Sequence, residues 1–178
     1  MRITADNGTD FRFRLAGASR HPDVDDGVIS DEDLAADNTD ASLPAGVAWV
    51  APVEESAQRT FVCDMGVPQV GRVIEAMSWT FRDGHAVEFT AKRNLAAAQT
   101  KWAEASGDKD MFGLGLNPRA KAGFLQSTMV AGAVTVGIGE NRSSGGKNTS
   151  SDGFAGTLVS GTVEIGGRVA IDRGKWIG

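Results

Sequence analysis

Few side chains in this sequence have the chemistry of metal ligands or nucleophiles. The 178 residues include two histidines, His21 and His85, one cysteine, Cys63, and no tyrosine. A single cysteine excludes an intramolecular disulfide and a zinc cluster built on thiolates. Two histidines cannot supply a three-histidine metal site. This scarcity limits the chemistry that the chain can perform by itself.

Nucleophilic catalysis has little support in the sequence. A Ser–His pair requires a histidine within hydrogen-bond reach of the serine. We expect both histidines to be solvated, because His21 adjoins an acidic stretch and His85 follows Asp-Gly in a turn. Cys63 lies in the apolar string FVCDM, where we expect a buried, inert thiol.

Three glycine-rich strings differ from known phosphate-binding loops. Residues 113–118 (GLGLNP) and 137–141 (GIGEN) have neither the Gly-x-Gly-x-x-Gly spacing nor a Lys-Ser/Thr pair. The backbone amides of residues 143–147 (SSGGK) are suited to an anion, but a plain surface loop is the favoured interpretation.

Residues 23–40 form an acidic stretch with eight carboxylates and no basic residue. Such a run repels itself and buries little, so we expect a solvated loop. A calcium site is the alternative, but the spacing does not match an EF-hand loop.

The elements that position these residues are mostly strands. Alternating or short apolar runs bounded by turn residues predict strands over residues 2–4, 11–15, 47–53, 60–63, 77–81, 86–91, 111–116, 130–138, 162–165 and 168–171. Residues 95–105 predict the one principal helix, with Asn94 as its N-cap and Gly107 as its end. Residues 143–156 are rich in Gly and Ser, and we expect them to form an exposed, weakly anchored loop. The pattern indicates a single α+β domain over residues 1–178.

The overall composition excludes some classes of partner. The net charge is −5, which argues against a nucleic-acid surface, and hydrophobic residues make up 41% of the chain, enough for a core. No run of about 18 apolar residues predicts a membrane span, and the N-terminus has no apolar signal segment. We therefore expect a cytoplasmic protein that contacts neither membrane nor nucleic acid.

Four strings, in order and with consistent spacing, are similar to those of a known family. They are residues 43–56 (LPAGVAWVAPVEES), 112–118 (FGLGLNP), 132–141 (GAVTVGIGEN) and 162–174 (TVEIGGRVAIDRG). They resemble the strings LPxGEVxxAPxExS, GIGxNP, GTVHIAxGxN and TVxxDGxxxxxxG of the metal-dependent aminopeptidases typified by aminopeptidase T and aminopeptidase S. Relatives of that family include 2,5-dihydroxypyridine 5,6-dioxygenase. The resemblance covers nearly the whole chain, matches the C-terminal portion of those enzymes, and implies a mixed or antiparallel, barrel-like sheet.

The resemblance also implies where a metal site would lie. Active members hold two metal ions with two glutamates, two histidines and an aspartate, beside a tyrosine. The glutamates fall on Val47 and Met111, the first histidine on Thr135 and the tyrosine on Arg142. The final His-x-Asp pair falls on Ser150 and Asp152 or, with a shifted gap, on Gly153 and Ala155.

At best, therefore, Asp152 survives as a metal ligand, and the resemblance implies a degenerate site. One carboxylate does not offset the dehydration of two divalent ions. The candidate cleft consists of Val47, Met111, Asn117, Thr135, Arg142 and Asp152.

Three functions follow as expectations. The first is a divergent, non-hydrolytic family member without a cofactor, whose cleft binds a small anionic or apolar ligand or serves assembly. The second is an active aminopeptidase or ring-cleaving dioxygenase relative, with a divalent metal and with ligands from a partner chain. The third is a structural or assembly module. The resemblance further implies a homo-oligomer, or a partner that supplies the missing N-terminal domain.

Overall fold

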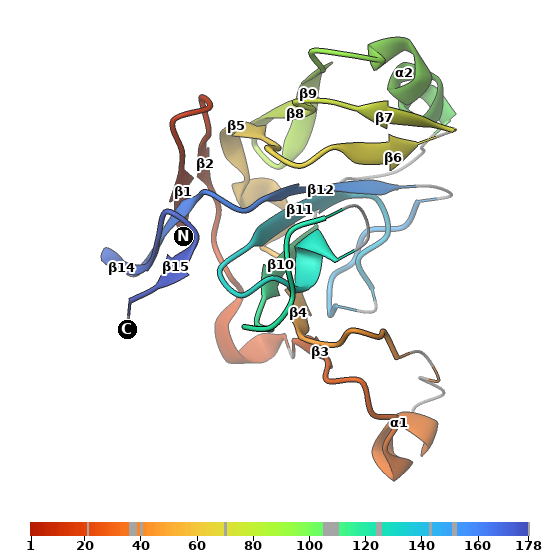
Figure 1. Ribbon diagram of the computed structural model, residues 1–178, viewed down its shortest axis with the longest axis vertical. Helices are drawn as coiled ribbons and strands as arrows, with labels where there is room; N and C mark the ends of the chain where they lie inside the picture. The colour runs from red at the N-terminus through yellow and green to blue at the C-terminus, as the bar shows by residue number, and fades with distance from the viewer. Residues whose placement is uncertain are drawn as a thin grey trace.

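The computed structural model describes residues 1–20, 22–35, 39, 41–69, 71–104, 111–123, 126–142, 144–150 and 153–177. Strands dominate it, as the sequence predicts, and they form two larger antiparallel sheets and one separate hairpin (Figure 1). The first sheet has eight strands in the order β15 (Lys175–Trp176), β14 (Arg168–Asp172), β13 (Thr162–Ile165), β1 (Arg2–Thr4), β2 (Asp10–Arg12), β5 (Gln58–Val62), β8 (Ser78–Arg82) and β9 (His85–Thr90). The second has five, in the order β12 (Phe154–Leu158), β11 (Val134–Ile138), β10 (Met111–Gly115), β4 (Val47–Val50) and β3 (Asp23–Asp25).

Among the described residues, two α-helices and three short 3₁₀ helices accompany the sheets. They are α1 (Asp31–Ala35), α2 (Leu95–Glu104), η1 (Gly17–Ser19), η2 (Glu54–Ser56) and η3 (Ser127–Met129). The main predicted helix is confirmed as α2, in which Ala98 is buried and Trp102 stacks on Phe89 of β9 with ring centroids 5.1 Å apart. Asn94 immediately precedes this helix, but its φ of 59° is not the extended conformation of an N-cap, and its side-chain amide donates to the carbonyl of Val73. Gly107 lies outside the described residues.

An aromatic core lies between the two larger sheets. Phe11 packs against Phe13 and Phe81, and the ring of Phe13 lies 4.7 Å from that of Phe112 on β10, so the cluster joins both sheets. Gly156 of β12 allows the closest approach, because a Cβ there would collide with the Cys63 sulfur and lie 3.0 Å from Met77. Burial of these rings from water supplies the main stabilisation of the fold.

Neither larger sheet closes into a barrel among the described strands, so the barrel-like arrangement is not confirmed. The hairpin of β6 (Val67–Gln69) and β7 (Arg72–Ile74) is not among the predicted strands, and within the described residues it pairs only with itself. Its pattern is weak because Pro68 interrupts the apolar alternation.

The prediction of a solvated loop over residues 23–40 is wrong in part. Asp23–Asp25 pairs with β4 as β3, and Asp31–Ala35 forms α1, which projects away from the sheets in Figure 1. Asp25 links the two ends of this projection, because its carboxylate accepts the backbone N–H groups of Gly27 and Ser42. Residues 36–38 and 40 lie outside the described residues.

The prediction of an exposed loop over residues 143–156 is also wrong in part, because the segment from residue 154 onward is β12. Ser144 and Asn148 are buried. The Asn141 side-chain oxygen accepts the Asn148 N–H at 2.8 Å, and the Ser144 carbonyl accepts the N–H of Ala51. Polar side chains thus anchor a segment whose composition predicts mobility.

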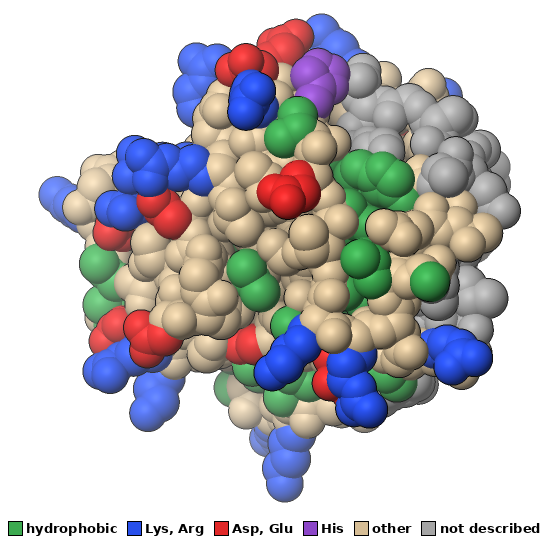
Figure 2. Space-filling model, turned by 90° about the horizontal axis from the view of Figure 1, so that it is seen from above, with side chains coloured by type: hydrophobic (Ala, Val, Ile, Leu, Met, Phe, Trp, Pro, Cys, Tyr) green, Lys and Arg blue, Asp and Glu red, His purple; other side chains and the backbone are tan. Residues whose placement is uncertain are grey.

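No described helix has the length and apolar character needed to cross a membrane. Figure 2 shows the end of the molecule seen from above, where Lys and Arg side chains stand out around the margin and carboxylates lie among them.

Candidate functional site

Three of the predicted cleft positions lie on neighbouring central strands of the second sheet. Val47 is on β4, Met111 on β10 and Thr135 on β11, and these strands are adjacent. In the register, Trp49, Gly113, Thr135 and Thr157 form one row across β4, β10, β11 and β12. Val47 pairs with Gly115, two residues beyond Gly113 on β10. Met111, two residues before Gly113, pairs with Gly137. The three positions therefore lie on adjacent strands, with Val47 and Met111 in rows on either side of Thr135.

Thr135 lies buried at the middle of this row, with 1% of its surface exposed. Its hydroxyl is hydrogen-bonded to the Thr157 hydroxyl at a distance of 3.0 Å. Both residues are β-branched and therefore suited to a strand, and each satisfies a polar group that would be costly to bury alone. The Thr135 hydroxyl therefore already has a hydrogen-bond partner within the sheet.

Two segments of the chain cover the same region. A Cβ on Gly113 would collide with the indole of Trp49, so the Trp49 ring lies directly against the strand at this glycine. A Cβ on Gly115 would collide with the carbonyl of Val130, so the chain just after η3 lies over the next row. Val47 is only 2% exposed as a result. Sequence reasoning missed Trp49, although a tryptophan two residues after Val47 and level with a glycine was a usable signal.

Asn117 links this cover to the sheet. Its side-chain NH₂ donates to the Ala45 carbonyl at 2.7 Å, and its side-chain oxygen accepts the N–H groups of Arg119 and Ala120. Its backbone N–H donates to the Met129 carbonyl at 2.8 Å. These bonds hold η3 against the segment that leads into β4.

Ala155, the alternative position for the final aspartate, lies on β12 two residues before Thr157, whereas no contact among the described residues brings Arg142 to Thr135. Arg142 is exposed, and its Nε lies 2.7 Å from the Glu140 carboxylate. Hydrogen bonding to Arg142 holds the pKa of Glu140 below its ordinary value. Asp152 lies outside the described residues, and so does His21. His85 is exposed at the start of β9.

Cys63 is buried, as predicted. Burial, with a smaller contribution from the charge of Asp64, raises the pKa of its thiol far above the ordinary range. A thiol that stays protonated is a poor nucleophile, so its inertness follows from its surroundings.

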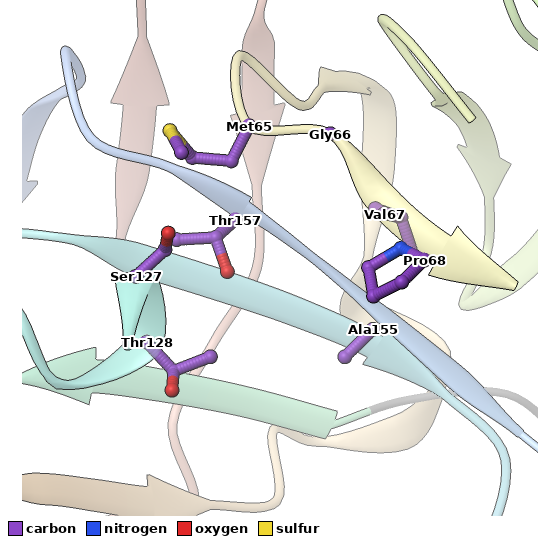
Figure 3. Close-up of a pocket in the computed structure, with 8 residues that line it drawn as sticks. All are labelled: Met65, Gly66, Val67, Pro68, Ser127, Thr128, Ala155 and Thr157. Carbon is purple, nitrogen blue, oxygen red and sulfur yellow. The ribbon is translucent and has the colours of Figure 1, made fainter. Parts of the chain in front are cut away.

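A pocket of about 120 Å³ opens beside the Thr135–Thr157 pair (Figure 3). Its lining carries no charged side chain and comes from the start of β6, η3 and β12: Met65, Gly66, Val67, Pro68, Ser127, Thr128, Ala155 and Thr157. Figure 3 shows Ala155 below Val67 and Pro68, and Thr157 below Met65 and Gly66. Thr157 is thus shared between the pocket and the hydroxyl pair.

The chemistry of the donor set does not fit a two-metal site at these positions. Val47 has no donor atom, the Thr135 hydroxyl is already bonded, and the Trp49 ring lies over the neighbouring glycine. Within the described part of the chain, no three His, Cys, Asp or Glu side chains lie close enough together to hold a metal ion.

The fold is similar to that of two solved structures. One is the structure of 2,5-dihydroxypyridine dioxygenase from Pseudomonas putida KT2440, with a TM-score of 0.73 and 16% identity over 99% of this chain and 54% of that chain. The other is wild-type AmpT from Thermus thermophilus, with a TM-score of 0.64 and 17% identity over 99% of this chain and 49% of that chain. The chain therefore spans about half the length of either. No family model matches the sequence. The curated proteins contain no match either.

Proposed function

We propose that the chain is a divergent, non-hydrolytic relative of the aminopeptidase T and dihydroxypyridine dioxygenase fold, with a pocket for a small uncharged ligand in place of a metal site. The hydroxyl pair of Thr135 and Thr157 carries the proposal. It occupies the position where the sequence resemblance expects a metal-binding histidine. A neutral, internally satisfied pair of hydroxyls attracts a divalent cation far less than imidazole and carboxylate do.

The surroundings of the pair support the same function. Val47 and Trp49 make the region apolar, and an apolar region lowers the affinity for a bare ion because dehydration is not offset. The space that remains lies at the β12 edge, where the lining is uncharged. Uncharged linings with a few hydroxyl and backbone groups suit small neutral molecules.

Metal analysis of the purified protein tests the loss of the metal site. After dialysis against zinc, cobalt or iron, we expect well under one ion per chain, and no hydrolysis of amino-acyl anilides. Aminopeptidase T treated in the same way is the positive control. Two stoichiometric ions per chain would overturn the proposal and favour an enzyme completed by a partner chain.

Ligand binding is tested separately by NMR with a set of small neutral compounds. We expect shifts of the amide signals that line the pocket, and weaker binding by Thr157→Val, which keeps the shape of the side chain but removes its hydroxyl. Thr100→Val, at an exposed position of α2, is the matched control and should bind as the wild type does. Shifts elsewhere, with none at the pocket, would contradict the assignment of the site.

A further inference from the structure

The pocket lies at an open backbone edge. Strand β12 is the last strand of the second sheet, so one of its sides has no β-partner in that sheet. The Thr157 carbonyl accepts the Met65 N–H at 3.2 Å, so the backbone of Thr157 points outward, away from β11. Alternate residues of an antiparallel strand point their backbone groups the same way. The N–H and carbonyl of Ala155 therefore point outward too.

Part of this edge is already bonded. The Val159 N–H donates to Asp64 at 2.8 Å, and the Thr157 carbonyl is bonded to Met65. Within the described part of the chain, the Thr157 N–H and the N–H and carbonyl of Ala155 have no such partner. All three groups belong to residues that line the pocket.

The pairing of β6 with β7 leaves this edge open. The Met65 N–H bonds to the Thr157 carbonyl, so a continued antiparallel ladder would place Val67 opposite Ala155. Val67 pairs with Ile74 of β7 instead, and the next residue, Pro68, has no N–H to donate. The two segments separate, and the pocket of about 120 Å³ lies between them (Figure 3).

We propose that this pocket binds a short extended peptide segment, whose amide groups pair with the open edge of β12. The Ala155 N–H would donate to a ligand carbonyl and the Ala155 carbonyl would accept a ligand N–H, which is strand addition on a small scale. The pocket is too small for large side chains, and its uncharged lining disfavours a free terminus. This inference specifies which class of ligand the pocket of the proposed function binds, and it rests on that function.

The test uses the whole protein and N-acetylalanine methylamide, an uncharged compound with two amide groups. We expect its NMR titration to shift the Ala155 and Thr157 amides and to saturate. At a ligand concentration ten times the dissociation constant, hydrogen exchange at the Ala155 amide, which the ligand would bond, should slow about tenfold. Saturating shifts that leave both amides unaffected would overturn the inference.

Two variants at one position separate backbone pairing from shape. Ala155→Pro removes the outward N–H, which an edge strand tolerates, and should weaken binding by about tenfold or more. Ala155→Gly keeps the N–H and loses only the methyl group, so it should bind clearly more tightly than Ala155→Pro. Equal affinity of the two variants would overturn the inference.

A second comparison decides the question even if Ala155→Pro fails to fold. The methyl ester of N-acetylalanine lacks one N–H, and the wild type should bind it several-fold more weakly than the methylamide. If ester and amide bind equally, or if only non-amide compounds fill the pocket, the inference fails and the proposed function stands. Two bound metal ions per chain would instead overturn the proposed function.

Discussion

At the scale of single residues, the Thr135–Thr157 pair joins the interior of the sheet to the pocket. Thr135 is fully buried and Thr157 nearly so, and each hydroxyl has the other as its partner. A buried hydroxyl without a partner costs more free energy than the bond itself contributes, because desolvation is then uncompensated. The energetic role of the pair is therefore visible only when the two side chains are changed one at a time.

Thr135→Val should lower the free energy of unfolding by about 2 kcal/mol, because it leaves Thr157 without its partner. The double variant Thr135→Val with Thr157→Val should recover most of that loss, since two apolar side chains of the same shape replace two paired hydroxyls. Urea unfolding of the two single variants and the double variant measures the coupling. Strictly additive losses would contradict the pairing.

A second residue-scale prediction concerns the ion pair of Arg20 and Glu54, whose side chains are 10% and 18% exposed. Arg20 also donates to the carbonyls of Ala51 and Pro52, and Glu54 accepts the Lys147 N–H at 3.0 Å. Burial alone would raise the pKa of Glu54, but the bonds from Arg20 and the backbone outweigh it, and the pKa lies below its ordinary value of 4.5.

Because the pKa is lowered in the folded state, this stabilisation is fully present above pH 4.5 and is lost as the pH falls through the folded-state value. Glu54→Gln should lower the free energy of unfolding at pH 7 by about 3 kcal/mol, since it leaves Arg20 buried without its counter-charge. The difference from the wild type should shrink in acid, as urea unfolding at several pH values would show. Glu140→Gln, in the exposed pair with Arg142, is the control and should change little. A difference that stays constant down to pH 3 would contradict this account.

At the scale of elements, the close approach of β12 to the first sheet depends on Gly156. Gly156→Ala should lower the free energy of unfolding by about 2 kcal/mol, because the added methyl group meets Cys63, Met77 and Trp79 in a filled core. Gly123→Ala is the matched control, since its nearest neighbour would lie 3.8 Å from the new methyl group. Thermal unfolding should show a clear loss for the first variant and almost none for the second. Equal effects would mean that β12 is not tightly packed.

The elements that the sequence predicts well are those with a strong local pattern. The N-terminal and C-terminal hairpins and α2 have clear alternation, turn residues or helical spacing. The β6–β7 hairpin and β12 were missed because a proline in one and several small residues in the other weaken that pattern. Tertiary contacts hold β12 in place, because Gly156 packs closely against Cys63 and the Asp64 carboxylate accepts the Val159 N–H just after the strand.

The candidate site was predictable only as far as its strand positions. The strings similar to those of the family contain Val47, Met111 and Thr135, and the structure has these residues on adjacent strands. Strand pairing fixes which positions of neighbouring strands lie opposite each other. The pocket itself depends on Trp49, η3 and the separation of β6 from β12. These are contacts between segments far apart in the sequence, which no local pattern encodes.

At the scale of the whole molecule, the projection that carries α1 is nearly independent of the core. Helix α1 has no buried residue, and Val28, Ile29 and Leu34 are exposed. Replacing residues 28–41 with two glycines should change the free energy of unfolding by less than about 1 kcal/mol, because Asp25 already holds the two ends together. Urea unfolding of the shortened chain measures this. A larger loss would mean that the projection contributes to the fold.

The same projection makes the molecule an electric dipole. Six of the 23 acidic residues lie between positions 26 and 40, which leaves 17 acidic residues against 18 Lys and Arg in the rest of the chain. The rest of the chain, which includes Asp23 and Asp25 of β3, is therefore close to neutral, and the excess negative charge belongs to the segment that carries α1. In an electric field or near a charged surface, such a molecule orients before it makes contact, with this segment turned toward positive charge. Its net charge alone describes neither end.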